Sequence, residues 1–239
     1  SFVQIWQDTF QHITFDTYPK SRLLCPYMQQ HQKLGILVAS DLQRDLIIES
    51  CTTLRRERFK NLVETFSAAS IAITAWPGNF KMGIVPPDSF TSLGPQNKQG
   101  NNVIYLPRQG TKRSVSNEKA ILDVLHTYFK EELLVYVPEN SWRKDQTVFN
   151  SASIIIGPHG GAMANMIFAP VNTTVIEFLP LTHLKTRGEN ERPCYFGLAR
   201  GMGFNYHAVE PSDFGFDKPM TVPIEELKET LDLLRNNNN

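Results

Sequence analysis

The 239-residue sequence has no net charge and few cysteines. Lysine plus arginine and aspartate plus glutamate each number 24, so no global field favours nucleic acid or an anionic membrane, and any anion site must be local. The three cysteines, Cys25, Cys51 and Cys194, are far apart and show no zinc-type spacing, which argues against a cysteine-based metal site. They leave the redox compartment open.

Several chemical signatures are also missing. The lack of G-x-S-x-G disfavours a hydrolase, and the lack of G-x-x-x-x-G-K-[ST] and G-x-G-x-x-G disfavours P-loop and ordinary dinucleotide folds. The longest apolar runs, such as Leu34–Ala39, are too short to cross a bilayer, and no signal-peptide pattern opens the chain. We expect no membrane contact from this chain. If an anchor has been removed, the expected location is the ER or Golgi lumen, and otherwise the cytoplasm.

Apolar patterns predict alternating strands and helices. Strands are expected at residues 22–25, 34–38, 70–76, 102–107, 132–137, 154–156, 174–179 and 205–209, and helices at 2–15, 41–51, 54–66, 114–130, 147–152, 194–201 and 224–234. Such alternation favours an α/β fold with parallel sheets and crossover helices. A linker rich in Pro, Gly, Ser, Asn and Gln covers residues 83–102. We therefore predict one lobe with its linker over 1–98, a second over 99–235, and a polar tail over 236–239.

One stretch, Ser153–Asn165, carries the clearest functional signal. Ile154–Ile156 is typical of a buried parallel strand, Gly157–Pro158 is expected to end it, and His159–Gly161 leads into a segment with good helix propensity. The backbone N–H groups and helix dipole of such a turn suit a phosphate or diphosphate. The alternative is that the two glycines only shape the turn for packing.

A basic loop, Arg108–Arg113, follows the strand predicted at 102–107. Open α/β sheets bind ligands at the carboxyl ends of their strands, where this loop is expected. Ser116 or Asn117 could cap the helix that comes next.

Four segments of the second lobe agree in order with one family pattern. Residues Ile104–Glu118 resemble the family's strand, arginine-containing loop and S-R-x-x-x-N-E, and Gly157–Asn165 resembles its G-x-H-G-A-x-x-x-N, with Gly161 as a departure. The V-I-E strand matches Val175–Glu177. The pattern Y-x-x-L-A with a later tyrosine matches Tyr195–Ala199 and Tyr206. The chain resembles glycosyltransferase family 61 over nearly its whole length.

The first lobe carries a weaker match. The family's N-x-x-H-x-x-x-D helix corresponds to residues 1–8, where Gln4 replaces the usual histidine, Ser1 replaces asparagine, and Asp8 keeps the carboxylate. Gln4 and Asp8 are four residues apart, so in a helix they share one face. Without the resemblance, they are an ordinary solvated face of an amphipathic helix.

The resemblance implies a GT-B-like fold, with two Rossmann-like lobes whose parallel sheets face a central cleft. It implies an inverting enzyme that moves a sugar, xylose or GlcNAc, from a UDP-sugar to a glycan or protein-linked hydroxyl. No cofactor or metal is expected. The sequence has no D-x-D, the motif that holds a metal on the diphosphate in other glycosyltransferases, and this agrees with arginines and backbone amides in that role.

The donor site implied by the resemblance lies in the second lobe. Arg108 and Arg113 can hold the diphosphate by charge-assisted hydrogen bonds, and Glu177 could accept hydrogen bonds from ribose hydroxyls. Alternatively, the arginines pair with surface acids and Asn165 only braces the turn. The full set of expected donor-binding residues is Arg108, Arg113, Asn117, Gly157, His159, Gly160, Gly161, Ala162, Asn165 and Glu177.

The predicted general base is Asp8 on the acceptor side, with Gln4 orienting it or the acceptor and with His159 as the second catalytic candidate. Two other functions stay open at this point. A pseudoenzyme would bind the nucleotide sugar but lack a competent base, and a Rossmann-type oxidoreductase would bind NAD(P) instead.

Overall fold

The computed structural model describes residues 18, 21–22, 24–30, 36–38, 41–61, 100–110, 112–139, 142–180, 194–213 and 218–237. The chain divides into two compact units, Ser1–Asn79 and Phe80–Asn239. In the part of the chain that the structure describes, no helix is both long and apolar enough to cross a membrane.

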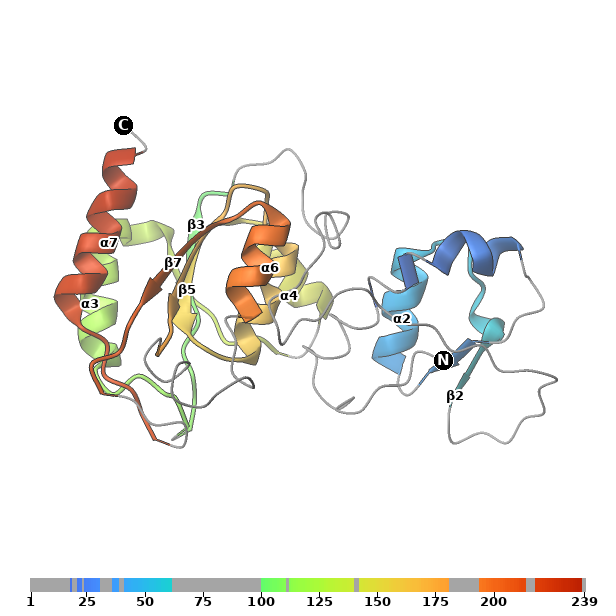
Figure 1. The fold of residues 1–239 in the computed structure, drawn as a ribbon, viewed down its shortest axis with the longest axis horizontal. Helices are drawn as coiled ribbons and strands as arrows, with labels where there is room; N and C mark the ends of the chain where they lie inside the picture. The colour runs from blue at the N-terminus through green and yellow to red at the C-terminus, as the bar shows by residue number, and fades with distance from the viewer. Residues whose placement is uncertain are drawn as a thin grey trace. The chain divides into compact units, whose positions relative to one another are not determined.

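The second unit is built on a sheet of five parallel strands in the order β4-β3-β5-β6-β7 (Figure 1). The strands are β3 (Asn102–Tyr105), β4 (Leu133–Val135), β5 (Ala152–Pro158), β6 (Thr174–Phe178) and β7 (Asn205–Val209). All of β6 is buried, as expected for a parallel strand with helices on both faces. The predicted α/β fold with a parallel sheet is confirmed for this unit.

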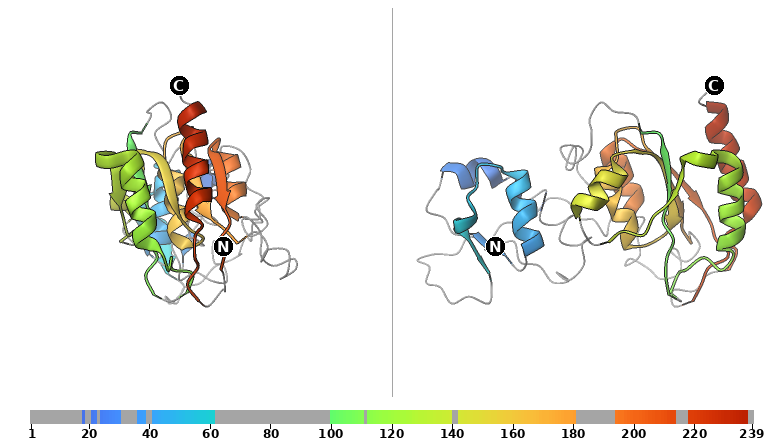
Figure 2. Two further views of the ribbon diagram at one scale, coloured as in Figure 1. Left: turned by 90° about the vertical axis from the view of Figure 1, so that its left-hand side faces the viewer. Right: turned by 180° about the vertical axis from the view of Figure 1, so that it is seen from behind.

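Helices cover both faces of this sheet (Figures 1 and 2). Helices α3 (Glu118–Phe129) and α7 (Ile224–Asn237) pack side by side on one face. The other face carries α4 (Trp142–Phe149), the 3₁₀-helix η4 (Gly161–Phe168) and α6 (Cys194–Met202), while the short 3₁₀-helix η3 (Lys130–Glu132) leads into β4.

The core beneath α3 and α7 follows from side-chain spacing. Ile121 and Leu125 of α3, and Leu227 and Leu231 of α7, are each four residues apart and share one helix face. They pack with alternate residues of the strands, such as Ile176 and Phe178 of β6. Val175 and Glu177, which alternate with these residues along β6, therefore lie on the opposite face of the sheet.

The strand order creates a switch point between β3 and β5. From β3 the chain moves outward to β4, and then returns to place β5, β6 and β7 on the other side of β3. The connections after β3 and β5 run in opposite directions from the carboxyl ends of these two strands, and such a switch point is where open α/β sheets bind ligands. Both segments singled out from the sequence, the Arg108–Arg113 loop and the turn at His159–Gly161, follow these two strands.

The first unit contains two short parallel strands, β1 (Ile36–Val38) and β2 (Phe59–Asn61), with α2 (Asp41–Ser50) and the 3₁₀-helix η1 (Arg56–Arg58). Residues 24–30 are also helical. A disulfide joins Cys25 to Cys51 and lies within a buried apolar cluster. The described residues of this unit do not show a second Rossmann-like lobe.

Two predictions in the first unit are wrong. Residues 22 and 24–25, placed in a strand at 22–25, are helical, and Cys25 is bonded to Cys51. The helix predicted at 54–66 is replaced, as far as residue 61, by η1 and β2. Pairing with β1 buries Phe59 opposite Ile36, and this tertiary contact overrides local helix propensity.

In the second unit, several boundaries differ from the prediction: the strand predicted at 102–107 ends at Tyr105, for example, and the helix predicted at 114–130 begins at Glu118. Gly157 and Pro158 do not end β5 but pair with β6. Pairing of β5 with β3 stops at Tyr105 opposite Ile156. No β3 residue pairs with Pro158, so its missing N–H costs no hydrogen bond to β3. The helix predicted at 147–152 starts earlier and ends at Phe149, and Ala152 begins β5.

The predicted helix at 2–15, strand at 70–76 and residues 83–99 of the linker lie outside the described residues. The proposed lobe boundaries stay a prediction.

Candidate functional site

The last part of the loop after β3, residues 113–116, is hydrogen-bonded to the backbone of residues 218–220. Arg113 N donates to Lys218 O at 2.9 Å, and Met220 N donates to Ser114 O at 2.7 Å. Ser116 N donates to Met220 O at 2.8 Å, which makes a short parallel bridge centred on Val115 and Met220. Arg113 itself has a φ of 60°, a conformation that side chains other than glycine rarely adopt. Residues 113–116 are thus tied to the segment at 218–220.

The side-chain cap predicted for α3 is wrong, because Asn117 bonds to Val222 and not to the helix. Neither Ser116 nor Asn117 caps the helix through its side chain; Asn117 lies at the N-cap without a side-chain capping bond. Instead, its Nδ2 donates to Val222 O at 2.8 Å and its Oδ1 accepts from Val222 N at 3.1 Å. Asn117 therefore ties the start of α3 to the segment that leads into α7.

The turn after β5 was expected to present backbone N–H donors, and one of them, that of His159, is already used. The N–H of His159 is not available because it continues the sheet by donating to Phe178 O at 3.1 Å. The helix that follows is a 3₁₀-helix, not an α-helix, and its first bond runs from Met163 N to Gly160 O at 3.0 Å. Gly161 and Ala162 precede that bond, so their N–H groups have no partner within the helix.

Two guanidinium groups converge on this turn. Arg108 Nη1 and Arg113 Nη1 each donate to His159 O at 3.4 Å, although the two arginines come from a different loop. Arg108 is further held by a bond from Nε to Lys112 O at 2.6 Å. Gly160 makes this approach possible, because a Cβ there would lie 1.9 Å from Arg108 Nη1.

Two positively charged side chains lie close together at this point. Burial, and next the neighbouring charge of Arg113, lower the pKa of Arg108. In the part of the chain that the structure describes, no carboxylate forms an ion pair with Arg108; both of its hydrogen bonds go to backbone carbonyls. Two like charges are held together at the switch point, an arrangement that a bound anion would stabilise.

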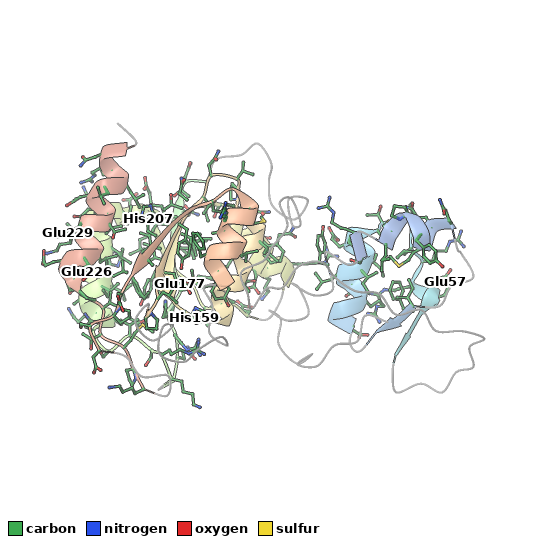
Figure 3. The ribbon with its side chains drawn as sticks, in the orientation of Figure 1. Glu57, His159, Glu177, His207, Glu226 and Glu229 are labelled. Atoms are coloured by element: carbon green, nitrogen blue, oxygen red, sulfur yellow. A yellow bond between two sulfur atoms is a disulfide. The ribbon has the colours of Figure 1, made fainter. Side chains whose placement is uncertain are left out.

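A chain of polar side chains lies beside the turn. Glu177 is fully buried, with Oε1 at 2.5 Å from His159 Nδ1, and Oε2 accepts a hydrogen bond from the Tyr206 hydroxyl. Figure 3 shows Glu177 and His159 close together at one end of the sheet. Tyr195 of α6 packs edge-on against the His159 ring, with centroids 5.2 Å apart. Both Glu177 oxygens thus have partners within the protein.

Two other predicted residues pack within the site's framework. Asn165 is buried, and its Nδ2 donates to Ala162 O at 3.2 Å, so it braces the first turn of η4. Its Oδ1 is buried and has no hydrogen-bond partner among the described residues. Gly157 lies against β3, where a Cβ would come within 2.9 Å of Leu106 O.

The structure therefore brings the residues after β3, β5 and the end of β6 to one place. Gln4 and Asp8 lie outside the described residues. Among the described residues there is no group of three His, Cys, Asp or Glu side chains that could hold a metal ion. Sequence reasoning missed the contacts of Tyr195 and Tyr206, since the only signal for them was their place in a family pattern.

Two matches with known proteins show the family of this chain. Residues 10–176 match the family model described as Glycosyltransferase 61, which is more than half of the chain. A β-1,2-xylosyltransferase of Arabidopsis thaliana is 28% identical over 138 residues, a match that covers 52% of this chain and 24% of the relative. The chain thus matches about a quarter of that protein's length. By the extent of the family match, this chain belongs to glycosyltransferase family 61.

Proposed function

We propose that the chain binds the diphosphate of a UDP-sugar at the switch point and transfers the sugar, with inversion, to a hydroxyl of a glycan or glycoprotein. Xylose is the first candidate sugar because the relative named above is a xylosyltransferase, and GlcNAc is the second. The proposal keeps the GT-B-like arrangement, in which a first lobe supplies the acceptor side. It requires neither a cofactor nor a metal ion.

The convergence of Arg108 and Arg113 on the His159 carbonyl is the observation that carries this proposal. A diphosphate is the anion that such a pair suits, because guanidinium groups donate two parallel hydrogen bonds to phosphate oxygens. The leaving UDP gains negative charge as the glycosidic bond breaks. Cationic donors already in place stabilise that charge without a reorganisation step.

Backbone amides complete the proposed diphosphate site. The N–H groups of Gly161 and Ala162 stand at the start of η4 and face no acceptor within the helix. Gly160 allows Arg108 to approach, and Gly157 allows β5 to lie close to β3. Asn165 holds the first turn of η4 in shape.

Three roles stay predictions. Asn117 and Glu177 are expected to bind the donor, Glu177 through its ribose hydroxyls. Asp8 is the proposed general base, assisted by Gln4, and would take the proton of the acceptor hydroxyl.

The disulfide favours one of the two expected locations. Cys25 and Cys51 are bonded, and disulfides persist in oxidising compartments such as the ER lumen but are rare in the cytosol. We therefore propose the secretory-pathway lumen over the cytoplasm.

Calorimetry with UDP, with and without EDTA, tests the donor site. We expect binding that EDTA does not weaken, and a loss of about tenfold or more in Arg113→Ala, because one charge-assisted hydrogen bond contributes about 1.5–3 kcal/mol. Arg235→Ala is the matched control, since Arg235 lies on α7 over the Tyr128 ring. Equal UDP affinity in wild type and Arg113→Ala would contradict the site.

Release of UDP from UDP-xylose or UDP-GlcNAc tests the activity. We expect Asp8→Asn to bind UDP as the wild type does but to transfer much more slowly. Full activity in Asp8→Asn would show that Asp8 is not the base. A wild-type chain that binds UDP but releases none with any acceptor would be the pseudoenzyme.

A further inference from the structure

The most unusual group in the second unit is the buried carboxylate of Glu177. It has no exposure to solvent and lies on β6, in the sheet face that α6 and η4 cover. Burying a carboxylate without partners is unfavourable, so its partners show what it does. They are the Tyr206 hydroxyl at Oε2 and His159 Nδ1 at Oε1.

Both contacts require a hydrogen-bond donor. An ionised carboxylate only accepts hydrogen bonds, so Nδ1 of His159 carries a proton and Tyr206 donates its own. This places one proton on Nδ1, so the second nitrogen, Nε2, is the one that can exchange a proton with a ligand. Among the described residues, no hydrogen-bond partner is found for Nε2, and the His159 side chain is 24% exposed.

The ring is also fixed in orientation. Tyr195 of α6 packs against it, and Phe196 of the same helix packs edge-on against Tyr206, with centroids 5.4 Å apart. The backbone of His159 is held by Phe178 at its N–H, and its carbonyl accepts from the two arginines. The imidazole therefore stands beside the proposed diphosphate site in one defined orientation.

We propose that Tyr206 and Glu177 are positioning residues that hold His159 as an imidazolium, and that its Nε2–H donates to the leaving phosphate oxygen of the donor. This inference rests on the donor site proposed above. It assigns His159 to the leaving group, on the side of the sugar opposite the base that takes the acceptor proton. It also gives Glu177 a role other than ribose binding.

The proton balance of the step is simple. The bond between the anomeric carbon and the β-phosphate oxygen breaks, its electron pair stays on that oxygen, and the Nε2 proton bonds to it. The acceptor oxygen forms the new bond to the anomeric carbon and passes its proton to the base. Nε2 regains a proton from water after UDP has left.

Histidine ¹⁵N spectroscopy tests the assignment without any turnover. The chain has six histidines, and His159→Gln identifies the His159 signals. We expect Nδ1 of His159 to be protonated in the UDP-free protein and the Nε2 signal to move when UDP saturates the site. In Glu177→Gln, the preference for a proton on Nδ1 should be lost.

A second test uses the rate of UDP release from UDP-xylose or UDP-GlcNAc as a function of pH. Among the described residues, the charged and titratable groups around His159 are Glu177, Tyr206, Tyr195, Arg108 and Arg113, and of these only Glu177 supplies a carboxylate. Removing that negative charge in Glu177→Gln should move the alkaline limb of the profile to lower pH. It should also slow release by about 100-fold, with UDP affinity little changed.

Tyr206→Phe is the milder variant, since it keeps the ring and removes only the hydroxyl. Its matched control is Tyr128→Phe, which also removes a tyrosine–carboxylate bond (Tyr128 to Asp232, 2.8 Å) but on the α3–α7 face. We expect slower release in Tyr206→Phe alone.

The outcomes separate the two proposals. Failure of the wild-type chain to bind UDP would refute the donor site and this inference with it. UDP binding that leaves the Nε2 signal in place, or a Glu177→Gln variant with an unmoved pH profile, would overturn the leaving-group role alone.

Discussion

Gly160→Ala is the substitution whose effect on the site can be worked out most fully. A Cβ at residue 160 would lie 1.9 Å from Arg108 Nη1 and 3.2 Å from its Cζ, whereas the nearest other atom, Pro158 O, is 3.9 Å away. The only close contact is with the end of a long side chain. We therefore expect the fold to persist and the Arg108 guanidinium to leave the turn.

The expected loss of UDP-binding free energy is that of one charged hydrogen-bonding group. Such a bond contributes about 1.5–3 kcal/mol, which corresponds to a rise in the Kd for UDP of about 10- to 150-fold. Isothermal titration calorimetry at one fixed salt concentration measures this directly. The control is Gly203→Ala, where φ is +73° and a Cβ would have no neighbour within 4 Å. It should strain the backbone by about 1–2 kcal/mol yet leave UDP affinity unchanged.

A double-mutant cycle shows whether Arg108 carries the effect. If Gly160→Ala acts by displacing Arg108, it should change UDP affinity little in a chain that already carries Arg108→Ala. Additive losses in the double mutant would mean that the alanine disturbs the turn itself. Wild-type affinity in Gly160→Ala would refute the placement of Arg108 at the diphosphate.

Three further predictions concern stability. The pKa of Arg108 is lowered on folding, so the folded chain binds this proton less tightly and the charged side chain opposes folding at neutral pH. Arg108→Met should therefore raise the Tm of the UDP-free protein and lose the stabilisation that UDP gives to the wild type. A lower Tm in the UDP-free variant would contradict this. Cys25→Ser opens a loop with a sequence separation of 26 and should destabilise the first unit by about 3.5 kcal/mol, measured as faster hydrogen exchange at residues 41–61, with Cys194→Ser unchanged. Asn117→Ala loses both bonds to Val222 and should lower the free energy of unfolding in urea by about 1–3 kcal/mol; an unchanged midpoint would show that the pair contributes nothing.

Much of the second unit could be predicted because its signals are local. The β-branched run Ile154–Ile156 and the apolar segment at 174–179 became adjacent parallel strands, and the spacing of Ile121 and Leu125 became the buried face of α3. Errors arose where a distant partner decided the outcome. Phe59 joined a strand because Ile36 was available to pair with it, and β5 continued through Pro158 because β3 had already ended there.

The candidate site divides in the same way. The residue types at Arg108, Arg113 and the Gly160–Gly161 turn predicted an anion site from the sequence alone, because guanidinium groups and the N–H groups of such a turn both suit phosphate oxygens. The sequence could not show that both arginines reach one carbonyl, since they are 46 and 51 residues away from it. Nor could it pair Glu177 with His159 and Tyr206.

From the sequence by itself came the family, the α/β class and the residue types suited to a diphosphate, since each depends on short motifs and periodicity. The tertiary structure decided the strand order, and with it the switch point where the loops after β3 and β5 meet. It also decided the protonation partner of His159, because a buried carboxylate takes its hydrogen bonds from whichever donors the fold brings to it.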